Sequence, residues 1–327
     1  TSASGLAFLK AVTVGYEIST RIGTALGRTH YQYWHNTGTV GTFGAAAAAA
    51  SLYGLSAQSF THALATCATF AAGLQQAFRM DSMSKPLHSG RAAETGVAAA
   101  QMARAGITGS LDVLDGDSGL GRAMSNGPDW MSVLSTLGQA FNITRMTFKN
   151  HACCGHTFAA IDAAQVLQAQ LNVRAEDIER IDVGTYGPAL DVAGNPQPRT
   201  AAEARFSLPF VVANAIVHGS VRLAAFSPER LEDRAVRQLM QRIHLTVNTE
   251  ADQLFPRQRS ALVQFTLSNG TQASYLQPHR KGDPDLPLSD TDLDSKFMEL
   301  VHPVLGAAKS DHLLKQLWSL ETAPRLP

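Results

Sequence analysis

The fold predicted for the first part of the chain depends on the stretch Thr42-Phe43-Gly44-Ala45-Ala46-Ala47-Ala48-Ala49-Ala50-Ser51-Leu52, in which six of eleven residues are alanine. Two more alanine-rich segments follow at 56–75 and 90–105, and residues 6–22 have the pattern of a helix. Alanine has the highest helix propensity, and small side chains let helix backbones approach closely. The sequence therefore predicts helix after helix up to about residue 142, with Ser56 at one helix start and Gly106 at a stop.

The pattern changes after residue 142. Short, partly alternating runs rich in β-branched and aromatic residues predict strands. These runs are residues 145–148, 178–186, 243–247, 261–267 and 272–276, and Asn269-Gly270 joins the last two as a hairpin. Helical stretches lie between them at residues 157–171, 209–218 and 228–241, which is an α+β pattern.

The end of the chain, at residues 291–305 and 310–320, returns to a helical pattern. We therefore expect a mainly α protein: a discontinuous all-α domain with a smaller α+β domain inserted in it. The expected boundaries give residues 1–142 as the first part of the all-α domain, 143–285 as the α+β domain and 286–327 as the returning helices.

Composition excludes several classes of protein. Hydrophobic residues make up 45% and charged residues 17%, so the chain can bury a core and is not disordered. Lys plus Arg equals Asp plus Glu at 27 each, which predicts no nucleic-acid partner. No apolar run is long enough for a membrane span, and three cysteines form no disulfide framework. The default prediction is a cytoplasmic protein.

Two loops that lead into alanine-rich segments carry candidate anion-binding groups. Three glycines and three threonines follow His35 within residues 34–44, and backbone N–H groups at such a helix start bind anions. Residues 83–94 bring together Lys85, His88 and Arg91, cations suited to carboxylates. Pro86 predicts an extended turn rather than a helix at Lys85. The alternative interpretations are a capping loop with an incidental histidine and a solvated basic loop.

A third segment, residues 149–162, holds His151, Cys153, Cys154 and His156. A zinc site is not expected, because the cysteines are adjacent and no second ligand pair follows. A thiol nucleophile is conceivable, but nothing marks either cysteine as activated, and small buried cysteines explain them. A helix that starts at Thr157 would place His156 at its N-terminus, where the pKa falls and a neutral imidazole can accept a proton. Without a glycine-rich nucleotide motif, no cofactor is expected.

Taken in order, these motifs resemble the MmgE/PrpD family. The matching stretches are residues 15–18, 34–44, 84–93, 149–162, 204–210 and 296–297, which cover essentially the whole chain. The resemblance implies an all-α domain and a smaller α+β domain with the active site in the cleft between them, usually in a homodimer. Members include 2-methylcitrate dehydratase, cis-aconitate decarboxylase and iminodisuccinate epimerase. They act beside a carboxylate without an organic cofactor or an obligatory metal.

The resemblance also implies roles for individual residues. His35 and Lys85 fall on the family's active-site histidine and lysine, and His156 is the expected proton-transfer group. A cation such as Lys85 stabilises the charge that develops on a carboxylate next to a carbanion. The expected substrate-binding residues are Thr37, His88, Arg91, Lys149 and Arg205.

Three departures from the family pattern narrow the expectation. Decarboxylase-like members carry a histidine four residues before an acidic residue that matches Asp162, where this chain has Phe158. They place a tyrosine at the position of Phe210, so both differences argue against cis-aconitate decarboxylation. His156, six residues before Asp162, looks more like the methylcitrate dehydratases. The family also begins with a helical stretch that would lie before Thr1, which we expect to be cleaved, lost or supplied by another polypeptide.

Three functional hypotheses remain. The first is a cofactor-independent hydratase or dehydratase that acts on a small hydroxy-polycarboxylate, similar to 2-methylcitrate dehydratase. The second is an epimerase of a dicarboxylate such as iminodisuccinate, which needs two proton donors but no leaving group. The third is an inactive family remnant that serves as a binding scaffold.

Overall fold

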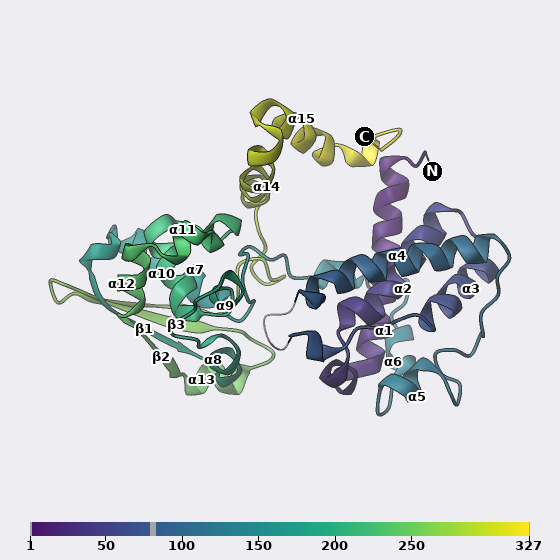
Figure 1. The fold of residues 1–327 in the computed structure, drawn as a ribbon, viewed down its shortest axis with the longest axis horizontal. Coiled ribbons are helices and arrows are strands. Elements are labelled where there is room, and N and C mark those ends of the chain that lie inside the picture. The colour runs from purple at the N-terminus through teal and green to yellow at the C-terminus, as the bar shows by residue number, and fades with distance from the viewer. Residues whose placement is uncertain (1, 79–82, 327) are drawn as a thin grey trace. The chain divides into compact units, whose positions relative to one another are not determined.

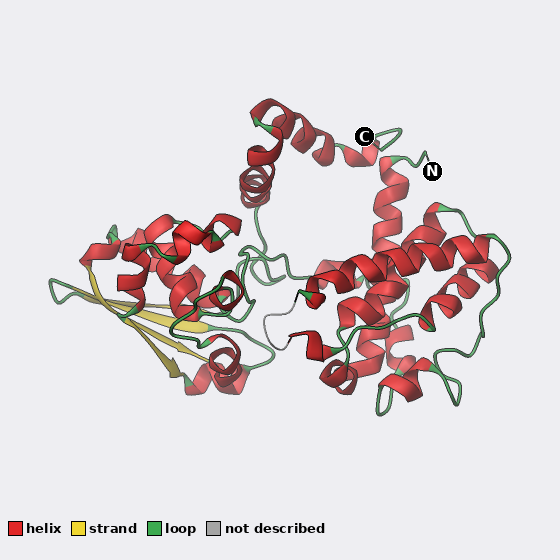
Figure 2. Cartoon of the chain, in the orientation of Figure 1, coloured by secondary structure: helices red, strands yellow, loops and turns green. Residues whose placement is uncertain are grey.

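The structure is a computed structural model that describes residues 2–78 and 83–326. The chain divides into two compact units, residues 1–145 with 311–327 and residues 146–310. The predicted fold class is confirmed: the protein is mainly helical and contains a small four-stranded sheet (Figures 1 and 2). The expected domain boundaries stay predictions. None of the helices in the part that the structure describes is long and apolar enough to cross a membrane.

The first unit is a helical bundle centred on α2 (Asn36–Leu52). Its other long helices are α1 (Gly5–Tyr33), α3 (Ala57–Ala68) and α4 (Ser84–Arg104). Short helices α5 (Leu120–Met124) and α6 (Trp130–Leu134) follow, and most of α15 (Ala307–Trp318) belongs to this unit. The backbones of α2 and α4 approach so closely that a Cβ on Gly96 would lie 2.5 Å from the carbonyl oxygen of Thr42. The small residues read from the sequence therefore serve close helix packing.

Two local predictions in this unit are wrong. The helix predicted at residues 56–75 begins as expected, with the Ser56 side chain accepting from Ser59 N–H, but α3 ends at Ala68. Lys85, expected on an extended turn, lies in the first turn of α4. Pro86 does not prevent this. The N–H groups of the first helical turn have no partner within the helix, so a proline there costs no intrahelical hydrogen bond.

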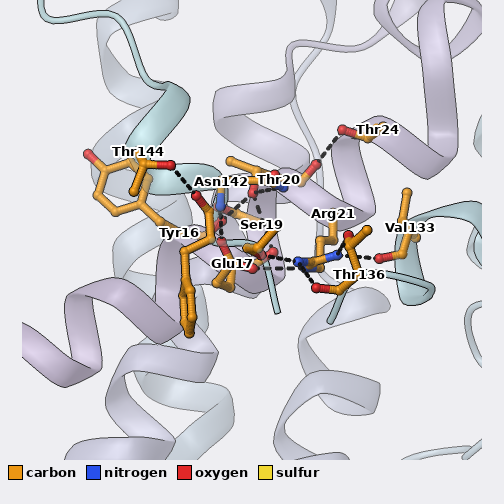
Figure 3. Close-up of polar contacts among 12 residues, drawn as sticks. Tyr16, Glu17, Ser19, Thr20, Arg21, Thr24, Val133, Thr136, Asn142 and Thr144 are labelled. Carbon is orange, nitrogen blue, oxygen red and sulfur yellow. Dashed lines mark hydrogen bonds and ion pairs between the residues drawn. The ribbon is translucent and has the colours of Figure 1, made fainter. Parts of the chain in front are cut away.

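A buried ion pair ties the segment after α6 to the middle of α1 (Figure 3). Arg21 Nε lies 2.9 Å from Glu17 Oε2, and the two side chains are 7% and 8% exposed. Arg21 also donates to three backbone carbonyls between residues 133 and 140, and Glu17 accepts the backbone N–H of Asn142. Because a buried charge needs a partner and hydrogen bonds, this network fixes a loop that has no regular secondary structure of its own.

The second unit packs helices on a four-stranded sheet of order β2-β1-β3-β4. β1 (Ile178–Thr185) pairs in parallel with β2 (Ile243–Val247) and antiparallel with β3 (Ala261–Leu267). β3 pairs antiparallel with β4 (Gln272–Gln277) through the predicted hairpin, where Gly270 has φ +83°. α7 (Phe158–Leu171) lies against β3 and β4, and α10 (Leu208–His218) packs on α7.

The other α-helices of this unit complete it. They are α8 (Gly187–Ala193), α9 (Ala201–Ala204), α11 (Pro228–Leu231), α12 (Arg234–Met240), α13 (Thr249–Leu254) and α14 (Asp290–Leu305). The helix predicted at 228–241 is split, because Asp233 accepts from the N–H groups of Ala235 and Val236 and starts α12.

The strand predicted at residues 145–148 is absent from the structure. Residues Asn142–Arg145 form a 3-10 turn, and the Phe148 N–H donates to the carbonyl of Gly282 rather than to a strand. The alternating pattern is present, but no neighbouring strand continues a ladder with it, and strand pairing requires one.

Candidate functional site

His35 stands at the N-cap position of α2, held by its backbone. Its N–H donates to the carbonyl of Gly73 at 2.8 Å, and its carbonyl accepts from Gly38 N–H at 2.9 Å. A Cβ at Gly38 would lie 2.4 Å from the carbonyl oxygen of Ala72, so only glycine allows this approach. The imidazole makes no capping hydrogen bond to α2. The backbone therefore positions the ring and leaves it to contact other side chains.

The ring of His35 meets His88, which lies one turn after Lys85 on α4. The two Nδ1 atoms are 2.8 Å apart. Only one of them can carry the hydrogen between them, so in this contact one ring donates and the other accepts. Burial, followed by the charges of His88 and Lys85, lowers the pKa of His35 to about 4. The structure thus brings together three of the predicted residues around a neutral imidazole.

Two other predicted residues of this unit, Arg91 and Thr37, are exposed to solvent. Arg91 Nη1 pairs with Glu94 Oε2 at 2.8 Å, and the two side chains are 70% and 68% exposed. Thr37 is exposed in the first turn of α2. Neither observation tests a contact with a ligand, so the substrate-binding roles of Thr37 and Arg91 stay predictions.

His30, which was not among the residues predicted from the sequence, supports the start of α2 from the core. His30 is 0% exposed, and its Nδ1 lies 3.1 Å from the carbonyl oxygen of Met124. Its Nε2 lies 2.8 Å from the hydroxyl of Thr39, a residue of the first turn of α2. Because both ring nitrogens are occupied inside the core, His30 is a structural residue.

In the second unit, His156 directly precedes Thr157, the N-cap residue of α7, as predicted. Its Nδ1 is 2.9 Å from the hydroxyl of Tyr186, which follows β1 and is 1% exposed. Burial, then the charges of Arg259 and Arg280, lowers the pKa of His156 to about 4. Burial raises the pKa of Tyr186 to about 12, so the phenol keeps its proton. The pKa of His156 is lowered, as predicted from its place before the helix, but the causes are burial and two arginine charges; its role in proton transfer stays a prediction.

Phe255 forms an aromatic wall beside this pair. Its ring stacks on Tyr186 with centroids 4.6 Å apart and an interplanar angle of 15°, and it lies 6.3 Å from the His156 ring. The Phe255 ring adds to the burial of the imidazole, and burial disfavours its charged form.

Two arginines near His156 differ in their partners. Arg280 forms a two-pronged pair with Asp283, with Nε–Oδ2 at 2.9 Å and Nη2–Oδ1 at 2.6 Å. Thr147 donates its hydroxyl to the same carboxylate at 2.7 Å. Arg259 has no ion pair or hydrogen bond among the residues that the structure describes, and its guanidinium carbon lies 6.0 Å from the Phe255 ring centroid.

Lys149 lies at the edge of a second cationic cluster of this unit. Its side chain is exposed, and its carbonyl accepts from Lys296 Nζ at 2.6 Å. Burial, followed by the charges of Arg222 and Lys149, lowers the pKa of Lys296. Arg222 is paired with Glu299 at 3.1 Å. Lys296 adds a second cation near Lys149, whereas Arg222 is already paired with Glu299. Binding of an anion by Lys149 stays a prediction.

Arg205 is held against the core of the second unit. Its guanidinium carbon lies 4.8 Å from the centroid of the Phe226 ring, and its carbonyl accepts from the Cys154 N–H at 2.9 Å. The stacking is typical of an arginine that positions the chain, since the contact uses the flat face of the guanidinium.

His151 and Cys153 of the 149–162 segment are buried structural groups. His151 is 5% exposed and pairs with Asp162 at 3.0 Å. Burial raises the pKa of the Cys153 thiol to about 12, and its Sγ contacts the Thr157 hydroxyl at 3.2 Å. A protonated buried thiol is a poor nucleophile. Within residues 2–78 and 83–326, no group of three or more His, Cys, Asp or Glu could hold a metal ion.

Tyr186, Arg259 and Arg280 were not among the residues predicted from the sequence. Tyr186 was visible only as the end of a predicted strand, and Arg280 as the centre of the basic run 279–281. Arg259 carries no local signal, because it lies about one hundred residues after His156 and reaches it only through the pairing of β1 with β3.

Comparison with known proteins agrees with the resemblance. The model of the MmgE/PrpD N-terminal domain matches residues 1–132, and that of the MmgE/PrpD C-terminal domain matches residues 151–320. A cis-aconitate decarboxylase-like protein of Aspergillus oryzae is 28% identical over 98% of this chain and 69% of its own length. The cis-aconitate decarboxylases of Mus musculus and Homo sapiens are 28% and 27% identical, over 97% of this chain and 66% and 67% of their lengths. The chain thus spans about two thirds of these relatives.

Proposed function

Because the chain belongs to the MmgE/PrpD family, we propose that it is a cofactor-independent lyase that removes water from a small hydroxy-polycarboxylate. The observation that carries the proposal is the neutral imidazole of His156, hydrogen-bonded to Tyr186 and placed beside arginine charges. A neutral imidazole accepts a proton, and a neighbouring cation stabilises the charge that develops when the proton leaves a carbon next to a carboxylate.

The proposed reaction uses the two ring nitrogens of His156 differently. Nδ1 contacts the Tyr186 hydroxyl, which leaves Nε2 to take the proton from the substrate carbon. The electron pair of the broken C–H bond moves onto the carboxylate and then forms the C=C bond as hydroxide leaves the next carbon. His35, which is also neutral, is the proposed second acid/base, and Lys85 the proposed carboxylate-binding cation.

Decarboxylation is the second candidate, and it is favoured by the activity named for the relatives. Loss of CO2 leaves a carbanion that must be protonated, so it would use the same histidines. Against it, Phe158 and Phe210 are both 0% exposed and belong to the core of the second unit. Neither position can supply the polar group that the decarboxylase-like pattern places there, and this supports dehydration.

The test offers three kinds of substrate to the purified protein in D2O. With 2-methylcitrate or citrate, NMR should detect an unsaturated acid; with cis-aconitate, decarboxylation would release CO2. With a chiral dicarboxylate, epimerisation would incorporate deuterium and lose optical activity without forming an alkene. His156→Asn should reduce turnover by about 100-fold or more, the range for loss of a general base. His312→Asn, the same change at an exposed histidine, should leave turnover unchanged.

The outcomes separate the hypotheses. CO2 release from cis-aconitate without any dehydration would replace the proposal by decarboxylation. Proton exchange with racemisation alone would identify an epimerase. Tight binding of these acids without exchange of any proton would identify a binding scaffold, and the same result in His156→Asn as in the wild type would contradict the role of His156.

A further inference from the structure

A polar hollow of about 230 Å³ lies in the second unit, next to the loop that contains Arg259. We call it the arginine hollow, and its charged lining consists of Arg257, Arg259, His279, Arg280, Asp283 and Asp285. All of these residues come from the chain between α13 and α14. The lining is therefore built by one compact unit.

The carboxylates of the arginine hollow are already paired. Asp283 is bound by Arg280 through two hydrogen bonds, and Asp285 Oδ2 lies 3.6 Å from His279 Nδ1. Arg257 is exposed to solvent. Among the described residues this leaves Arg259, partly buried and without a carboxylate partner, as the cation in the arginine hollow that can take an incoming anion.

The contact of Arg259 with Phe255 is too weak to offset its charge. Its guanidinium carbon is 6.0 Å from the Phe255 centroid, at the outer limit of a cation–π contact, so that interaction is weak. A cation that no carboxylate of the protein offsets can pair with the anion of a ligand. The Phe255 ring neighbours both Arg259 and His156: its centroid lies 6.0 Å from the guanidinium carbon and 6.3 Å from the imidazole centroid, so Arg259 lies close to the proposed proton acceptor.

We infer that Arg259 binds a carboxylate of the substrate in the arginine hollow, next to His156. This inference rests on the proposed function and adds to it the group that selects a polycarboxylate. The planar guanidinium can donate two parallel hydrogen bonds to one carboxylate. Arg280 is a positioning residue, because its fork is occupied by Asp283 and its Nη1 points to the carbonyl of Gly155, the residue before His156.

The experiment measures binding without chemistry. Tricarballylate has three carboxylates and no hydroxyl, so it cannot be dehydrated; glutarate and methylsuccinate each lack one of its carboxylates. Calorimetric titration of the wild type should show tricarballylate binding about tenfold or more tightly than at least one of the two dicarboxylates, or about 1.4 kcal/mol. In Arg259→Gln this ratio should fall to near one, and Arg259→Lys should give an intermediate ratio.

Arg174→Gln is the matched control. Arg174 is an exposed arginine of the same unit that pairs with Glu176, so the variant loses one positive charge far from the arginine hollow in sequence and in contacts. It should keep the wild-type ratio, and thermal unfolding should show that all variants are folded. An unchanged ratio in Arg259→Gln, or no binding of any of the three acids to the wild type, overturns the inference.

The inference and the proposed function can fail separately. If tricarballylate binding depends on Arg259 but no substrate is turned over, the carboxylate site stands and the lyase proposal fails. If dehydration proceeds and Arg259→Gln leaves KM unchanged, the lyase proposal stands and the carboxylate site is refuted.

Discussion

Acidification is the most direct test of the chemistry proposed for His156. An ordinary imidazole has a pKa of 6.5, whereas burial and the arginines hold the pKa of His156 at about 4. Near pH 5.5, about 3% of His156 would be protonated, against about 90% of an ordinary histidine. The base form is present above the lowered pKa and is lost as pH falls through about 4. Because kcat/KM reports the free protein, kcat/KM for proton exchange near pH 5.5 should remain close to its value near pH 7.5, instead of falling about tenfold.

The assay must separate the protein's titration from that of the substrate, because the substrate carboxylates also take up protons in acid. We therefore expect the decisive measurement to be the NMR titration of the histidine ring protons of the free protein. The sequence has 11 histidines, and the signal of His156 is assigned by its loss in His156→Asn. Arg259→Gln removes one of the charges that disfavour the imidazolium, so it should raise the pKa of His156.

The reasoning about His156 would be refuted by a titration near 6.5 in the wild type. It would also be refuted if the acid limb of kcat/KM lay near 6.5 and moved in a variant of another histidine instead. A pKa that stays the same in Arg259→Gln would leave burial and the charge of Arg280 as the causes of the lowered pKa.

Three further predictions concern the helical unit. Arg21→Met leaves a buried carboxylate unpaired and should lower the free energy of unfolding by about 3–5 kcal/mol in urea denaturation; a loss below about 1 kcal/mol would contradict a buried network. His88→Asn should raise the pKa of His35 by removing a neighbouring charge, as NMR titration can check, and an unchanged value would leave the coupling unsupported. Gly96→Ala should destabilise by about 1–3 kcal/mol, because its Cβ would lie 2.5 Å from α2 backbone atoms. Gly90→Ala on the same helix faces open space and should stabilise by up to about 1 kcal/mol, so equal melting shifts would refute the packing argument.

Helices were predictable where composition alone determines them. The alanine-rich segments at residues 42–52 and 90–105 lie in α2 and α4 up to Arg104, since alanine has the highest helix propensity and glycine allows the contact between the two helices. The segment 145–148 failed for the opposite reason. Strand propensity becomes a strand only beside a partner, and the partner is chosen by contacts far along the chain.

Some residues of the candidate site could likewise be predicted from the sequence and others could not. His156 and the start of α7 could be predicted, because the turn, the cap and the helix are adjacent in sequence. The contact between His35 and His88 could not be measured from the sequence, although both residues were candidates. Arg259 was invisible, because its relation to His156 depends on the sheet that brings their segments together.

The two neutral histidines have a common physical logic. Cations lie near each of them: Lys85 near His35, and Arg259 and Arg280 near His156. Burial and these charges keep the free imidazole unprotonated, and the same charges attract a carboxylate. When a carboxylate binds such a cation, it offsets that charge, and the affinity of the imidazole for a proton rises. Binding and proton transfer are then linked, and the linkage is reciprocal: protonation of the imidazole must in turn favour the bound carboxylate. An anionic substrate thereby strengthens the base that acts on it.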